Sequence, residues 1–124
     1  MRLLLDTHVF LWWREENSRL NSETARVISE ADQVFVSAAS AWEIAIKVAL
    51  RKLHIPGPVE PAVEQSHFQQ LLVTFPHAAA VANLPLHHAD PFDRMLIAQA
   101  QVEGLTLITH DSKFRPYGVP IFWT

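Results

Sequence analysis

The chain has 124 residues, 49% of them hydrophobic, and a formal net charge of −3 at pH 7, which predicts one ordinary globular domain spanning residues 1–124. The lack of cysteine excludes disulfides and thiolate-bound metals. No signal peptide is visible and no apolar run approaches the ~20 residues of a membrane span, so we expect a cytoplasmic protein with no membrane partner.

The first half of the chain alternates short apolar runs with helical patterns. Its first apolar run is continuous, which is typical of a strand buried on both faces of a parallel sheet. In chain order, the predicted elements are a strand over Arg2–Leu5, a short helix over Thr7–Trp13, a helix from Asn21 or Ser22 to about Asp32, a strand over Gln33–Val36, and a long helix from Ser37 or Ser40 through Leu50.

The second half continues the alternation and carries the clearest helix signal, an Asp-Pro pair that serves as N-cap and first helical residue. The predicted elements are a helix over Pro61–Leu72, a strand near Val73–Phe75, a small helix over His77–Asn83, a helix from Asp90-Pro91 to Gly104, a strand over Leu105–Thr109, and an edge strand over Val119–Trp123. Alternating strands and helices predict an α/β fold with a mostly parallel sheet of four to five strands.

Four acidic residues fall where predicted strands end or helices begin: Asp6, Glu43, Asp93 and Asp111. In a parallel α/β sheet, strand ends and the following helix starts meet along one edge. Four carboxylates gathered there would repel one another, so a divalent cation is the expected partner. Oxygen ligands favour Mg²⁺ or Mn²⁺ over zinc, and such ions can activate water to hydrolyse a phosphodiester.

The negative net charge does not exclude a nucleic-acid partner. Setting these four carboxylates aside as metal ligands changes the formal charge of the remaining chain from −3 to +1. Net charge therefore decides little about phosphate binding here.

Four segments containing these acids resemble, in order, the acidic motifs of the PIN-domain ribonucleases, and within that family the VapC toxins of toxin–antitoxin modules. The segments are Leu3–His8, Ser40–Lys47, Asp90–Ala100 and Leu107–Asp111. The resemblance covers nearly the whole chain. It implies a PIN-like three-layer sandwich, in which helices flank the central sheet.

The resemblance also implies a function. Asp6, Glu43, Asp93 and Asp111 would bind one or two Mg²⁺ or Mn²⁺ ions and form the catalytic site of an endoribonuclease, with Thr109 supporting Asp111 through a hydroxyl contact. The substrate would be RNA. A small antitoxin would cover the site, and the protein would form a homodimer, or a heterotetramer or larger assembly with the antitoxin.

Each acid also has a simpler interpretation. Asp6 could be a turn residue, Glu43 a solvated helix residue, and Asp93 a residue favoured only by the helix dipole. Asp111 could cap a short segment over Ser112–Phe114. N-capping explains Asp90 completely, which places it second to Asp93 as a supporting site residue.

The histidines suggest a second kind of site. His87, His88, Asp90 and Asp93 could form a zinc set, but adjacent histidines on a loop point different ways, so we disfavour it. His8 and His110 adjoin site acids and are expected to line the site.

Three basic residues lie close to the acidic motifs. Lys47 and Arg51 are one helical turn apart, Glu43 is one turn before Lys47, and Arg94 directly follows Asp93. A solvated, ion-paired face is the favoured interpretation, and contact with the RNA backbone is the alternative. The tryptophans Trp12, Trp13 and Trp42 are expected in the core or at a dimer contact.

Two other classes of α/β domain remain as alternatives. A phosphoacceptor signalling domain should have an acid pair after its first strand, whereas Asp6 is followed by Thr7-His8. A non-catalytic binding module should have lost an acid, and none of the four is missing.

Overall fold

Five parallel strands form the centre of the molecule in the computed structural model, which describes all of residues 1–124. The strands are β1 (Arg2–Leu5), β2 (Gln33–Ser37), β3 (Gln69–Leu71), β4 (Thr106–Thr109) and β5 (Ile121–Trp123). Their order across the sheet is β3-β2-β1-β4-β5, and every neighbouring pair is parallel. The predicted parallel sheet is confirmed, with β1 at its centre.

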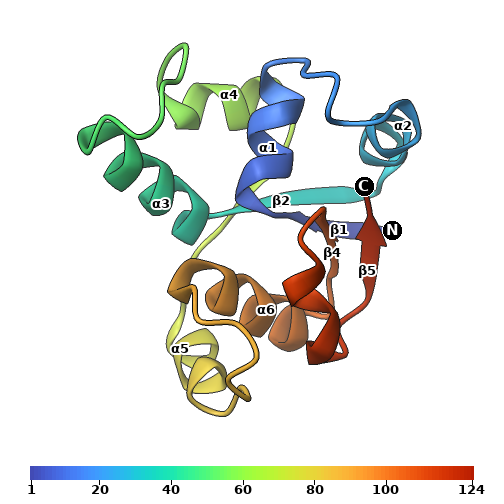
Figure 1. Ribbon diagram of the computed structural model, residues 1–124. Helices are drawn as coiled ribbons and strands as arrows, with labels where there is room; N and C mark the ends of the chain where they lie inside the picture. Colours follow the sequence, from blue (N-terminus) through green and yellow to red (C-terminus); the bar gives the residue numbers. More distant parts are fainter.

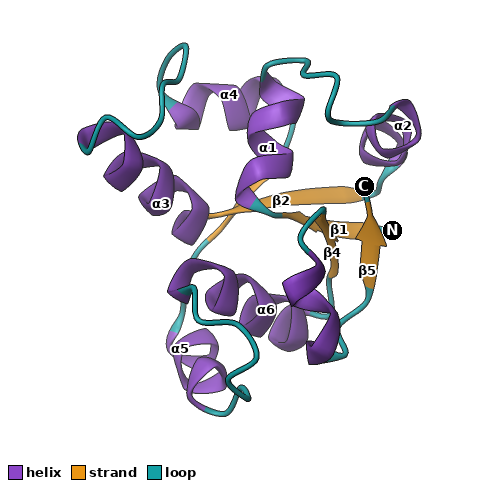
Figure 2. Cartoon of the chain, in the orientation of Figure 1, coloured by secondary structure: helices purple, strands orange, loops and turns teal.

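Helices cover both faces of this sheet (Figure 1, Figure 2). They are α1 (Thr7–Arg14), α2 (Ser22–Glu30), α3 (Ala38–Ala49), α4 (Val59–Gln65), α5 (Phe75–Ala82), α6 (Pro91–Glu103) and a 3₁₀ helix, η1 (Ser112–Tyr117). The first four helices lie on one side, and α5, α6 and η1 lie on the other (Figure 2). None of the helices combines the length and apolar character needed to cross a membrane.

Alternation of side chains along β1 divides the core into two halves. Leu3 and Leu5 pack with Phe10 and Ile44 beneath the first group of helices, whereas Leu4 packs with a second cluster on the opposite face. That second cluster includes Leu96, Ile97, Leu107 and Phe114. Burial on both faces explains why β1 is apolar at successive positions.

Local capping fixes where several helices begin. Asn21 caps α2 and accepts a hydrogen bond from the Thr24 backbone, and Ser37 rather than Ser40 caps α3. Asp90 caps α6, which ends at Gly104 in the left-handed conformation. These are the positions at which the sequence signals place the boundaries.

The segment between α3 and α5 differs from the predicted one. The helix predicted over Pro61–Leu72 is α4, which ends at Gln65, and the strand predicted near Val73–Phe75 is β3, which lies at Gln69–Leu71. Phe75 instead begins α5, because Thr74 caps that helix in a capping box with His77. Phe75 is 92% exposed. An edge strand with exposed glutamines lacks the apolar signature on which strand prediction depends.

Candidate active site

The four predicted acids lie at the carboxyl ends of the two central strands and on the helices beside them. Asp6 follows β1 and caps α1, where its Oδ1 accepts a 2.8 Å hydrogen bond from the backbone of Val9. Asp111 follows β4 by two residues and caps η1. Glu43 is buried in the second turn of α3, and Asp93 lies in the first turn of α6.

Thr109 joins two of these acids. Its buried hydroxyl donates a hydrogen bond to Oδ2 of Asp6 and accepts one of 3.0 Å from the backbone N–H of Asp111. The expected support of Asp111 is therefore made to its backbone, and the carboxylate that Thr109 binds is that of Asp6. Parallel pairing of β1 with β4 brings these residues together.

Glu43 has a partner at each carboxylate oxygen. Thr7 donates a 2.8 Å hydrogen bond to Oε1 and also lies 2.9 Å from the hydroxyl of Ser40. Nζ of Lys47 lies 2.7 Å from Oε2, and this hydrogen bond raises the pKa of Lys47. Sequence reasoning did not assign a role to Thr7, although its position directly after Asp6 was a usable signal.

The electrostatics of Asp93 show that the acids act on one another. Burial raises the pKa of Asp93 to about 8, and the charges of Asp90, Asp6, Glu43 and Asp111 add to the shift. Burial also raises the pKa of Asp6, although hydrogen bonds from Thr109 and Val9 oppose the change. This concentration of negative charge favours binding of protons or of a cation.

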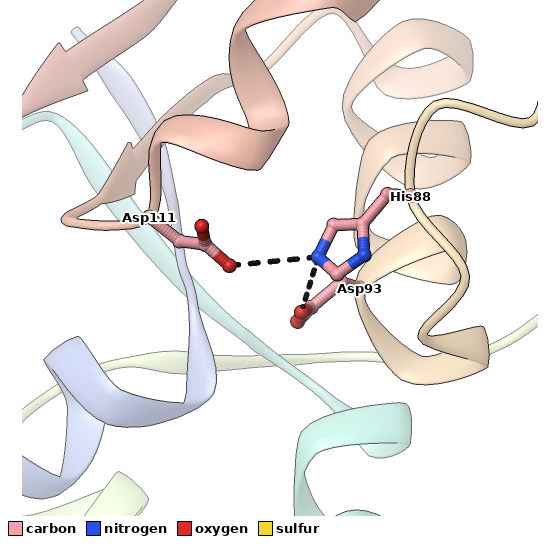
Figure 3. Close-up of side chains that lie close together, drawn as sticks. All are labelled: His88, Asp93 and Asp111. Carbon is pink, nitrogen blue, oxygen red and sulfur yellow. Dashed lines mark ion pairs between the residues drawn. The ribbon is translucent and has the colours of Figure 1, made fainter.

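His88 lies beside two of the four acids. Nε2 of His88 lies 2.9 Å from Oδ2 of Asp93 and 3.5 Å from Oδ2 of Asp111 (Figure 3). The neighbouring His87 turns away, with its ring 5.4 Å from that of Tyr117. The disfavoured zinc set is therefore not assembled as a whole, but a ring nitrogen of His88 and carboxylate oxygens of Asp93 and Asp111 lie within 4.8 Å of one another.

Asp90 and Arg94 support the start of α6. Oδ1 of Asp90 accepts hydrogen bonds from the backbones of Phe92 and Asp93, at 2.8 and 3.0 Å, as capping predicts. The guanidinium of Arg94 donates to four backbone carbonyls in and before the loop that leads to α6, those of Val81, Leu84, Pro85 and His88. Its donors are thereby directed at the protein rather than at a ligand.

The structure changes two expectations about neighbouring residues. Arg51 does not share a helix face with Lys47, because α3 ends at Ala49 and Arg51 has a left-handed φ of 58°. Of the two places expected for Trp42, the core is excluded, since Trp42 is 65% exposed and meets Phe92 edge-on at 5.3 Å; a dimer contact stays a prediction.

A cavity of about 460 Å³ opens beside Asp6 and Asp111. Its other lining residues are His8, Trp12, Arg19, His110 and Ser112. His8 and His110 therefore line the site, as expected. Trp12 lies between them, with ring centroids 6.3 Å from His8 and 5.8 Å from His110.

Fold and site together define a parallel α/β domain that gathers carboxylates at the ends of its central strands. A family model described as the PIN domain matches residues 3–119, and the chain belongs to the PIN-domain family. It is 32% identical over 121 residues to ribonuclease VapC22 of Mycobacterium tuberculosis, across 95% of this chain and 93% of that protein. The resemblance seen in the sequence is confirmed.

Solved structures share the fold. VapBC2 from Rickettsia felis bound to a promoter DNA fragment superposes with a TM-score of 0.71 at 12% identity, and DNA-bound VapBC from Salmonella typhimurium with 0.72 at 16%. Each alignment covers 99% of this chain and 98% of the matched chain. FitAcB from Neisseria gonorrhoeae gives 0.67 at 21% identity, over 97% and 96% of the two chains. The three-layer PIN-like arrangement is thus confirmed.

Proposed function

We propose that this protein is an endoribonuclease and the toxin of a toxin–antitoxin module. In this proposal, Asp6, Glu43, Asp93 and Asp111 hold one or two Mg²⁺ or Mn²⁺ ions and are the catalytic residues. The observation that carries it is the convergence of these carboxylates: Nε2 of His88 lies 2.9 Å from Oδ2 of Asp93 and 3.5 Å from Oδ2 of Asp111, and the charges of Asp6, Glu43 and Asp111 all act on Asp93. The family assignment and the name of the mycobacterial relative support RNA as the substrate.

The residues present fit a hard divalent cation. Carboxylate oxygens are the ligands that Mg²⁺ and Mn²⁺ prefer, and a cation would relieve the charge repulsion that adds to burial in raising the pKa of Asp93. Thr109 holds Asp6, and Thr7 and Lys47 hold Glu43, so these two ligands are oriented before any ion arrives. A bound ion would supply activated water and neutralise charge developing on the phosphodiester.

A covalent mechanism finds no support in the geometry. The hydroxyls in the hydrogen-bond network of the acids belong to Thr7, Ser40 and Thr109, and all three are buried and already hydrogen bonded. The hydroxyl of Ser112 lines the cavity but is exposed and has no base hydrogen bonded to it. Water is therefore the nucleophile in our proposal.

The phosphoacceptor alternative is also disfavoured by the geometry. Asp6 accepts hydrogen bonds at both of its oxygens, and β3 is followed by Leu72 and Val73 rather than by an acid. A phosphoacceptor domain should have an accessible aspartate after a strand in the middle of its sequence, and the third strand of this chain has none.

A protein partner is the second part of the proposal. Trp42 and Leu86, which are 65% and 81% exposed, line a groove of about 610 Å³ together with Phe92 and Met95. Exposed apolar surface of this kind is typical of protein interfaces. We assign this groove to an antitoxin. We further propose that the protein forms a homodimer without the antitoxin, and a heterotetramer or larger assembly with it.

The nuclease proposal is tested with purified, partner-free protein and total RNA, with Mg²⁺ and with chelator. Cleavage should require the metal, and Asp6→Asn and Asp93→Asn should each reduce it at least about 100-fold, because each removes a ligand charge at the reacting centre. Asp32→Asn is the matched control, since Asp32 is exposed and pairs with the N-terminus. Cleavage that persists in chelator, or undiminished cleavage by the two site variants, would refute the proposal.

A further inference from the structure

His88 is a buried histidine whose ring nitrogen is directed into the acidic group. The residue is 6% exposed, and its Nε2 faces Oδ2 of both Asp93 and Asp111 (Figure 3). Neither contact has the alignment of a regular hydrogen bond, so Nε2 is a buried polar atom without a hydrogen-bond partner of its own. Such atoms are rare in native proteins, and each one calls for a physical explanation.

The other ring nitrogen shows which chemical group His88 presents. The backbone N–H of Asp90 donates a 3.3 Å hydrogen bond to Nδ1 of His88. A nitrogen that accepts a hydrogen bond carries no proton, so in the neutral imidazole the proton is on Nε2. The atom that faces the acids is therefore an N–H donor rather than a lone pair available to a metal.

The ring is fixed from several sides. The backbone N–H of His88 donates to the hydroxyl of Tyr117 at 2.7 Å, and the ring packs edge-on against Phe114 with a centroid separation of 5.7 Å. Arg94 donates to the carbonyl of the same residue at 3.4 Å. Together these contacts hold the imidazole ring of His88 in one orientation.

We propose that His88 is a positioning residue for the metal site. Its Nε2–H attracts the carboxylates of Asp93, from α6, and Asp111, from the turn after β4, and holds these two mutually repelling groups close enough to share a divalent cation. His88 itself does not bind the cation. This inference rests on the metal site of the proposed function.

The first test measures Mn²⁺ affinity of the full chain without RNA, from the electron paramagnetic resonance signal of the free ion. His88→Leu should weaken binding about tenfold or more, the usual effect of removing a group that orients metal ligands. His88→Gln retains an N–H donor and should recover most of the affinity. His87→Leu, the matched control on the same loop, should not change it.

The second test asks whether nitrogen touches the metal. Pulsed electron paramagnetic resonance of the wild-type Mn²⁺ complex should show no directly bonded ¹⁴N, and a coordinated imidazole signal would overturn the proposal. Unchanged Mn²⁺ affinity in folded His88→Leu would overturn it too, as would failure of the wild type to bind Mn²⁺. If His88→Leu does not fold, the glutamine variant and the wild-type spectrum decide.

These readouts are independent of RNA cleavage. A protein that binds Mn²⁺ in a His88-dependent way but leaves RNA intact would refute the proposed nuclease function and leave the role of His88 standing. If RNA cleavage requires metal but Mn²⁺ affinity does not change in His88→Leu, the nuclease function stands and the role of His88 is refuted.

Discussion

The hydroxyl of Thr109, the last residue of β4, donates a hydrogen bond to the carboxylate of Asp6, the first residue after β1. Both residues are buried, and the bond lowers the pKa of Asp6 against the larger effect of burial. Thr109 thus favours the ionised carboxylate that a cation would need.

Replacing Thr109 by Val should weaken both the fold and the cation site, because a buried carboxylate and the backbone N–H of Asp111 lose a partner. We expect a loss of about 1–3 kcal/mol in the free energy of unfolding at pH 8, measured with urea. Mn²⁺ affinity should fall at least about tenfold. Thr106→Val on the same strand is the control, and equal behaviour of the two variants would contradict the assigned role.

Asp93 should make the metal-free protein less stable as pH rises. Its pKa is raised from the ordinary aspartate value of 3.8, which applies to the unfolded chain, to about 8 in the folded protein. Between these values the folded state retains a proton that the unfolded chain has released, so its stabilising contribution is complete below about pH 4 and is lost as pH rises through 8.

The measurement is the difference in free energy of unfolding between wild type and Asp93→Asn over pH 4–8, which cancels the titration of other groups. The wild type should lose stability relative to the variant as pH rises. Saturating Mg²⁺ should reduce this loss, because the ion binds the folded, ionised site. A difference that stays constant with pH would show that Asp93 keeps an ordinary pKa.

Arg94→Lys should not preserve the loop before α6. The planar guanidinium donates to several carbonyls at once, which a single ammonium group cannot reproduce. We expect a loss of about 1–3 kcal/mol in chemical denaturation, together with weaker Mn²⁺ binding, since the same loop carries His88. Arg26→Lys, in an exposed pair with Glu30, should change stability by less than about 0.5 kcal/mol. Similar losses of stability in both variants would contradict the proposed role of Arg94 in holding the loop before α6.

Three helices end with a non-glycine residue in the left-handed conformation: Glu16, Arg51 and His67, at φ 51°, 58° and 59°. Each follows a helix C-cap, and the N–H groups there bond back to the last turn, as Lys52 does to the carbonyl of Lys47. Arg51→Gly and His67→Gly should each raise the thermal unfolding free energy by about 1 kcal/mol, because glycine avoids the Cβ strain. Arg51→Ala should give no gain, and a gain equal to that of glycine would refute this account.

Signals within a few residues made much of the fold predictable. Asp90-Pro91 and Gly104 bounded α6, and the continuous apolar run of β1 indicated its burial, because caps and burial patterns act locally. The end of α4 was missed since His67 stands where glycine would have marked the stop. Strand β3 was displaced because its pairing with β2, rather than its own composition, makes it a strand.

The candidate site divides in the same way. Its acids could be predicted because strand ends and helix starts are readable from the sequence. His88 could not be assigned, because its direction depends on contacts with Phe114 and Tyr117, which come from η1 more than 20 residues further along the chain.

The bond between Asp6 and Thr109 joins residues 103 positions apart. Strand β4 must therefore be synthesised and must dock beside β1 before the acidic group exists, and such non-local pairing forms late in folding. Under the proposed function, a nascent chain on the ribosome is harmless for most of its translation, and cleavage activity arises only when the segment through Asp111 has emerged and folded. The cell then has that interval in which to supply an inhibitor before the first active molecule is complete.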